Sequence, residues 1–71
     1  MIALHQKIRR LREEKGLSKR ALGKRIGKSD THIRHIEGKQ REEISLDSFC
    51  KIAKALGVTP QELLKDTEYD Y

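Results

Sequence analysis

Hydrogen-bonding side chains of several kinds follow one another between residues 29 and 37, where the pattern predicts a helix. Ile33 and Ile36 mark its buried side, because they carry its only large apolar side chains. At 100° per residue, the opposite side presents a guanidinium, an imidazole and a hydroxyl, with a carboxylate at its edge. Arginine can bond guanine twice, aspartate can accept from cytosine N4, and threonine can meet a thymine methyl group. This side could simply be the solvated surface of a helix in a bundle. If it reads bases instead, the residues that do so are Asp30, Thr31, Arg34 and His35.

A metal site is the alternative chemistry for the two histidines of this segment. His32 and His35 are three residues apart, and His5 or Cys50 could complete the set of ligands. No acidic pair accompanies them, so we expect exposed or DNA-facing histidines, a packed thiol, and no metal or other cofactor. No nucleophile–base arrangement and no phosphate-cradling glycine loop is visible in the sequence. The chain is therefore not expected to be an enzyme or to bind a small-molecule substrate.

Several short helices must position this segment, and the sequence marks their ends. Apolar residues recur at helical spacing and no segment alternates as a strand does, so the predicted fold is all-α, a compact bundle of about five helices. Most of these helices have serine or threonine as the N-cap and glycine just after the last turn. The expected helices, with their caps, cover residues 3–15, 18–26, 29–37, 45–56 and 59–66.

The second and third of these helices form a helix-turn-helix pattern. Gly23 is small enough to let two steeply crossing helices approach each other closely, and Gly27 can supply the positive φ that the turn requires. Aliphatic residues on both sides of the turn would fix the pair to the other helices and hold the third helix rigidly. These residues are Leu22, Ile26, Ile33 and Ile36.

The charges are divided unevenly along the chain. Residues 1–41 carry thirteen Lys or Arg and four Asp or Glu, a net charge of +9, whereas residues 42–71 carry three and seven, a net charge of −4. The basic part suits a polyanion, although lysine and arginine also serve simply to solvate exposed helices. Lys19 and Arg20 lie in the first turn of the second helix, where the helix dipole disfavours cations unless phosphates arrive beside them. This distribution favours double-stranded DNA as the partner.

Length and composition exclude several other classes of protein. The 71 residues make one domain with a small core, and this core must be aliphatic because only 4% of the residues are aromatic and none is Trp. Such a core cannot wall a deep substrate cavity. A single cysteine suits a reducing compartment, and the apolar stretch at the N-terminus is too short for a signal peptide or a membrane span. We therefore expect a soluble cytoplasmic protein.

Four segments, in this order and spacing, carry a resemblance to a known family. They are residues 8–18 (IRRLREEKGLS), 22–27 (LGKRIG), 33–39 (IRHIEGK) and 51–64 (KIAKALGVTPQELL). Residues 7–65 thus resemble the phage-repressor family of helix-turn-helix domains, the Cro and cI type, whose members commonly dimerise on palindromic operators as repressors or activators. The resemblance implies base reading by Asp30, Thr31, Arg34 and His35. It also implies that Lys19 contacts the DNA backbone or an outer base and that the loop after the third helix grips phosphate. The full predicted set of DNA-backbone contacts is Lys19, Arg20, Lys28, Lys39, Gln40 and Arg41.

The chain departs from this family at several positions. Lys19 stands where the family often has Gln, and Lys28, in place of an apolar residue, is expected to extend outward. Gly23 replaces the more usual Ala, which weakens the second helix by about 0.5–1 kcal/mol. The loop after the third helix is one residue longer than is common and lacks its usual Pro.

Residues 1–66 are expected to form the DNA-binding domain, and residues 67–71 a short, acidic, frayed tail. The leading interpretation is a sequence-specific transcriptional regulator, a repressor acting as a homodimer. Leu64 and Tyr69 at the acidic end are candidate dimer contacts, with ordinary packing as their alternative. A second interpretation is an antitoxin that also regulates its own promoter, and a third is a helix-turn-helix that contacts only proteins.

Overall fold

Side-chain caps mark where four of the helices begin. The computed structural model describes residues 1–38 and 44–70. The hydroxyl groups of Ser18, Ser29, Ser45 and Thr59 each accept the backbone N–H three residues later, at 3.0, 3.3, 3.1 and 3.1 Å. These bonds satisfy donors that the first turn of a helix leaves unpaired, and they confirm four predicted helix starts. The helices are α1 (Leu4–Glu14), α2 (Lys19–Arg25), α3 (Asp30–Glu37), α4 (Leu46–Ala55) and α5 (Pro60–Leu64).

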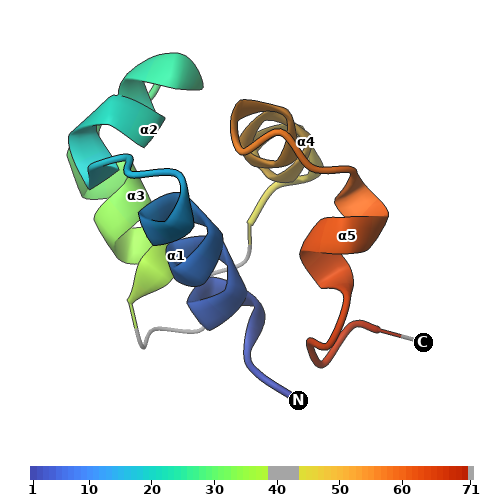
Figure 1. The fold of residues 1–71 in the computed structure, drawn as a ribbon. Coiled ribbons are helices and arrows are strands. Elements are labelled where there is room, and N and C mark those ends of the chain that lie inside the picture. Colours follow the sequence, from blue (N-terminus) through green and yellow to red (C-terminus); the bar gives the residue numbers. More distant parts are fainter. Residues whose placement is uncertain (39–43, 71) are drawn as a thin grey trace.

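These helices pack around one aliphatic core, and the predicted all-α bundle is confirmed. α2 and α3 lie on one side of α1, and α4 and α5 lie on the other (Figure 1). α1 contacts both α3 and α5, and α2 contacts α4, so the two sides are joined. None of these helices, in the part of the chain that is described, is long and apolar enough to cross a membrane. The core consists of Ile8, Leu22, Ile26, Ile33, Ile36, Ile52, Ala53, Leu56 and Leu63.

The described part of the acidic tail, residues 67–70, is held against the start of α1, so the expected fraying is wrong for these residues. Thr67 is fully buried and pairs with Ile2 in an isolated parallel bridge. The backbone N–H of Leu4 donates to Glu68 Oε1 at 2.7 Å, which places a carboxylate at the positive end of the α1 dipole. Lys7 Nζ donates to the carbonyl oxygen of Lys65 at 2.9 Å. These contacts join the first helix to the last residues described.

Candidate nucleic-acid interface

The turn between α2 and α3 brings two stretches of backbone together at Gly23. A Cβ atom at this position would lie 2.7 Å from the carbonyl oxygen of Ser29 and 3.1 Å from that of Lys28. The Lys28 amide also donates to the Gly23 carbonyl oxygen at 2.7 Å. At the turn itself, Gly27 has a φ of +74°, a conformation that glycine adopts without steric cost. The predicted need for a small residue at position 23 is confirmed, and the close approach leaves no room even for a methyl group.

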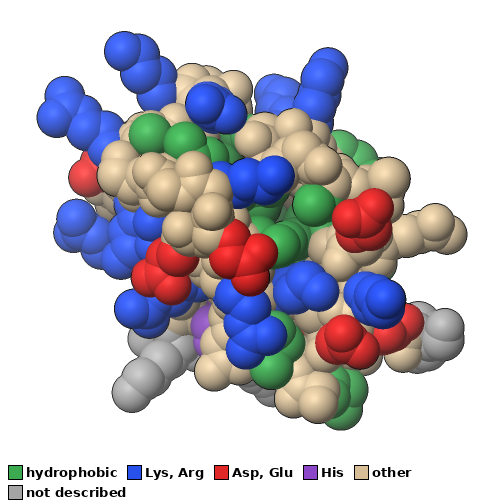
Figure 2. All heavy atoms as spheres, in the orientation of Figure 1, with side chains coloured by type: hydrophobic (Ala, Val, Ile, Leu, Met, Phe, Trp, Pro, Cys, Tyr) green, Lys and Arg blue, Asp and Glu red, His purple; other side chains and the backbone are tan. Residues whose placement is uncertain are grey.

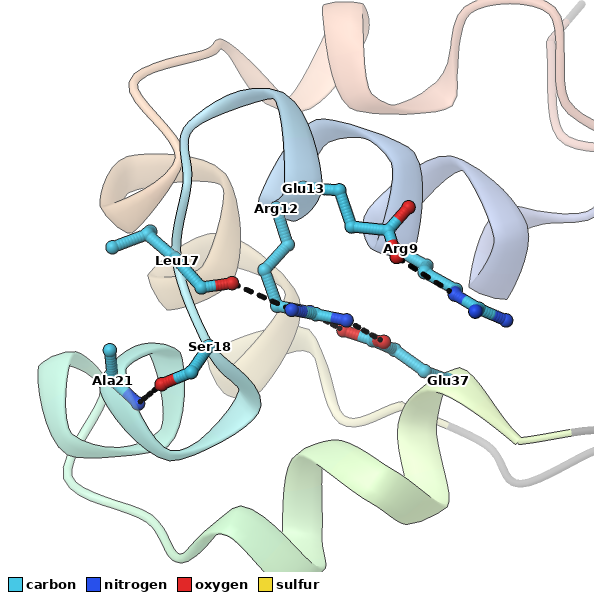
Figure 3. Close-up of polar contacts among 7 residues, drawn as sticks. All are labelled: Arg9, Arg12, Glu13, Leu17, Ser18, Ala21 and Glu37. Atoms are coloured by element: carbon cyan, nitrogen blue, oxygen red, sulfur yellow. Dashed lines mark hydrogen bonds and ion pairs between the residues drawn. The ribbon is translucent and has the colours of Figure 1, made fainter.

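A buried ion pair fixes the other end of α3. Arg12 Nε donates to Glu37 Oε2 at 2.7 Å, and Arg12 Nη2 donates to Glu37 Oε1 at 3.1 Å. The remaining nitrogen, Nη1, donates to the carbonyl oxygen of Leu17 at 2.6 Å. Figure 3 shows Arg12 reaching from α1 to Glu37, the last residue of α3. Because the two side chains are only 9% and 2% exposed, this paired geometry has to replace the hydration that both charges lose.

α3 turns an apolar side to the core and a polar side to solvent, as its sequence predicts. Ile33 is 0% exposed and Ile36 is 6% exposed. Thr31, Arg34 and His35 are exposed, and Asp30 is partly exposed at the start of the helix. The four predicted base-reading residues therefore share the accessible side of a helix that is held at both ends. Contact with DNA bases stays a prediction for each of these four residues.

Asp30 and Arg34 face each other one turn apart on this side. Arg34 Nη2 lies 3.7 Å from Asp30 Oδ2, and the two side chains are 66% and 47% exposed. An ion pair this long and this exposed contributes little to stability. The guanidinium can therefore leave the carboxylate when a better acceptor is presented to it.

Within the described residues, the histidines of α3 are not gathered with other side chains that could bind a metal. Among residues 1–38 and 44–70, no three His, Cys, Asp or Glu side chains come close enough to hold an ion. His32 is partly buried, and its Nε2 atom has no hydrogen-bond partner in that part of the chain. Cys50 is exposed, so the expectation of a packed thiol is wrong. The reason is its place on α4 two residues before buried Ile52, which puts the two side chains on nearly opposite sides of the helix.

Cations surround the amino end of α2 and the turn that follows it. Arg20 and Lys28 are exposed and Lys19 is partly exposed, and the predicted outward extension of Lys28 is confirmed. On the face drawn in Figure 2, Lys and Arg side chains project from the upper edge, over α2 and α4, while lower down Lys and Arg side chains are mixed with Asp and Glu. The three other predicted backbone contacts lie outside the described residues. They are Lys39, Gln40 and Arg41.

A shallow pocket of about 450 Å³ lies where α1, α2 and α4 end. Lys15, Arg25 and Lys54 line it, and Arg25 Nη1 donates to the carbonyl oxygen of Ala55 at 3.5 Å. Each of these cations stands at or beside the carboxyl end of a helix, where the dipole favours positive charge. The helix ends therefore account for these three cations without a ligand.

The ion pair between Arg12 and Glu37 was not predicted, although the sequence holds a signal for it. Arg12 follows Ile8 by four residues and Glu37 follows Ile33 by four, so each charged residue lies on the buried side of its helix. Opposite charges on two buried sides indicate a pair. Which helices meet, however, depends on how the chain packs.

Comparison with known proteins supports the interpretation of α2, the turn and α3 as a helix-turn-helix. A model of the helix-turn-helix family matches residues 8–63, which is most of the chain. A search of curated proteins gave no match.

Several solved structures share the fold. The restriction-modification controller protein C.AhdI from Aeromonas hydrophila is 33% identical, and the match covers 84% of this chain and 89% of that one, with a TM-score of 0.78. SinR, described as the master regulator for biofilm formation and solved in complex with DNA, is 27% identical, with 87% and 98% covered and a TM-score of 0.79. The P22 c2 repressor, solved in complex with a synthetic operator, is 29% identical, with 92% and 97% covered and a TM-score of 0.80.

Proposed function

Because this chain belongs to the helix-turn-helix family of the Cro and cI type, we propose that it is a repressor that binds a palindromic operator as a homodimer. Family and fold are those of DNA-binding transcriptional regulators. The observation that carries the proposal is the polar, accessible side of α3 on a helix that the Gly23 contact and the Arg12–Glu37 pair hold in place. A rigid helix can present its side chains to a major groove with little further loss of entropy on binding.

In this proposal α3 enters the major groove and reads bases. Arg34 would leave Asp30 and donate two hydrogen bonds to a guanine, and the released carboxylate would accept from a cytosine N4 amino group. Thr31 would contact a thymine methyl group, and His35 would bond a neighbouring base edge.

The backbone contacts are proposed for the cations around α2. Lys19 and Arg20 stand at the amino end of that helix, where a phosphate would neutralise charges that the dipole disfavours. Phosphate contacts of this kind set the register of the protein on the duplex and carry no sequence information themselves. The complete proposed set is Lys19, Arg20, Lys28, Lys39, Gln40 and Arg41.

The homodimer is proposed because a single copy makes a small interface. One such module buries about 600–1,000 Å² of protein surface on DNA, at the low end for specific complexes. Two copies related by a twofold axis double the contacts, provided that their reading helices lie about 34 Å apart in successive major grooves. Of the contacts predicted from the sequence, Tyr69 is 50% exposed and Leu64 is partly buried.

Selection of bound sites from random duplex DNA tests the proposal directly. The expected result is an inverted repeat with half-site centres about one helical turn apart, bound by two copies of the protein. Affinity for that site should fall with salt along a log–log slope near −0.9 per neutralised phosphate. Recovery of no preferred sequence, or an affinity that does not change with salt, would refute the function proposed here.

A further inference from the structure

The shallow pocket where α1, α2 and α4 end collects cations from three separate segments of the chain. Arg25 Nη1 lies 3.5 Å from the carbonyl oxygen of Ala55, the last residue of α4. Lys15 Nζ lies 3.7 Å from the place that a Cβ atom on Gly57 would occupy, and Lys54 stands in the last turn of α4. The three cations therefore converge on the end of one helix. We call this hollow the α4-end pocket.

The charge of the α4-end pocket is not balanced within the described residues. Each of the three helix ends contributes about half a negative elementary charge, which explains why cations stand here but neutralises only about half of their charge. None of the described residues that line the pocket is Asp or Glu. Among residues 1–38 and 44–70, no ion pair involves Lys15, Arg25 or Lys54. The hollow is therefore a positively charged site.

Apart from its cations, the pocket is lined by apolar side chains and by Gly57. Leu56 is 0% exposed, and Leu17 and Ala55 are partly buried. A volume of about 450 Å³ is within the range of small-molecule sites, which combine an apolar lining with a few polar groups. A guanidinium binds phosphate oxygens through paired donors, and ammonium groups bind them as point charges. The pocket therefore suits a ligand that carries a phosphate on an apolar body.

The α4-end pocket lies away from the surface proposed for DNA. None of the described residues that are predicted to contact bases or the DNA backbone lines it. Lys19 and Arg20 stand at the amino end of α2, whereas Arg25 is the last residue of that helix. Because seven helical residues span about 10 Å, the length of α2 separates the pocket from these two cations. This separation favours a free ligand over the operator backbone as the source of the phosphate.

We propose that the α4-end pocket binds a small phosphorylated molecule, with its phosphate between the three cations and its apolar body against Leu17 and Leu56. The ligand is bound there and not transformed. This inference goes beyond the proposed function and does not depend on it, because the residues of the pocket take no part in the proposed DNA contacts.

The place of Leu17 connects the pocket to the helix that is proposed to read bases. Its carbonyl oxygen accepts from Arg12 Nη1 at 2.6 Å, and Arg12 also holds Glu37 at the end of α3. The lining of the pocket is thus one hydrogen bond away from the pair that fixes α3. A ligand that binds the folded chain and not the unfolded one raises the stability of this whole unit by mass action.

Titration of the full chain with adenosine monophosphate (AMP) at constant ionic strength, followed by proton–nitrogen correlation NMR, tests the proposal. The amide signals of Leu17, Ala55 and Gly57 should shift and saturate at millimolar AMP, while those of Thr31 and His35 stay in place. Inorganic phosphate should shift the same signals but bind about tenfold more weakly, because it has no apolar body to cover the lining. Equal affinities for AMP and inorganic phosphate would overturn the role of the apolar lining.

Variants of the full chain identify the contacts. Lys15→Gln and Lys54→Gln should each weaken AMP binding about tenfold, because each removes one charged contact to the phosphate. Both side chains are exposed, so the melting temperature without AMP should stay near that of the original protein. Lys51→Gln is the matched control, since Lys51 lies on the same helix but pairs with Asp47 outside the pocket. Saturating AMP should raise the melting temperature of the original protein and of this control, and much less that of the two pocket variants.

A duplex of mixed sequence decides between a free ligand and the DNA backbone. Its addition to the AMP complex should leave the signals of Leu17 and Gly57 in their shifted positions, because the pocket and the reading helix are separate sites. Displacement of AMP by the duplex would assign the pocket to the DNA backbone and overturn the proposal. The absence of a saturable shift at millimolar AMP, or an equal loss of affinity in Lys51→Gln and Lys54→Gln, would overturn it as well.

Discussion

Replacing Arg12 by Met is the sharpest test of what holds α3 in place. The change keeps most of the side-chain volume and removes the guanidinium that bonds Glu37 at 2.7 and 3.1 Å and Leu17 at 2.6 Å. Glu37, whose side chain is 2% exposed, is then left as a buried charge without a partner. Loss of one member of a buried pair costs about 3–5 kcal/mol.

That cost is large in relation to the stability of the whole domain. At about 0.05–0.15 kcal/mol per residue, 71 residues give a free energy of unfolding of about 4–11 kcal/mol. Arg12→Met therefore removes between about a quarter and all of the stability. The double variant Arg12→Met/Glu37→Leu leaves no buried charge and should be more stable than either single variant. It should still be less stable than the original protein by about 1–3 kcal/mol, because the carbonyl oxygen of Leu17 loses its donor.

Urea unfolding followed by circular dichroism, with linear extrapolation to water, measures all four proteins of this double-mutant cycle. The control is Arg9→Met, since Arg9 pairs with Glu13 at 3.3 Å on the exposed side of the same helix and should change stability by less than about 1 kcal/mol. The reasoning is refuted if Arg12→Met costs no more than this control, or if the effects of the Arg12 and Glu37 changes add without coupling.

Three further predictions concern the turn, the reading helix and the tail. Gly23→Ala should destabilise the domain by about 1–3 kcal/mol in urea unfolding although alanine is the better helix former, because its Cβ meets the Ser29 backbone; a gain in stability would contradict the close approach. Arg34→Ala should remove discrimination at one base pair per half-site, worth about 1–3 kcal/mol, and leave non-specific binding largely intact; equal losses on selected and scrambled duplexes would show that α3 is not the reader. Glu68→Gln should lower stability by about 0.3–1 kcal/mol at low salt and less at high salt, because the charge interacts with the amino end of α1 at Leu4; a loss that does not change with salt would exclude the dipole as its cause.

Much of the fold follows from interactions within a few residues of each other, and these could be predicted from the sequence. A serine hydroxyl such as that of Ser29 bonds the N–H three residues later whatever the rest of the chain does, so the helix starts are local properties. The polar side of α3 follows equally from the 100° step beyond Ile33 and Ile36. The approach of Arg34 to Asp30 one turn away is also local, because opposite charges four residues apart on a helix are neighbours on its surface.

What only the tertiary structure decided involves groups far apart in the chain. Arg12 and Glu37 are 25 residues apart, and nothing local determines that α1 and α3 bring them together in the core. The acidic tail is held by Ile2 and Leu4, more than sixty residues before it, so its composition predicted fraying where packing produces a buried Thr67. Exposure of Leu46 is likewise settled by which helices cover α4. Sequence patterns report which side of a helix is apolar, but only the packing of the other helices determines how much of that side is covered.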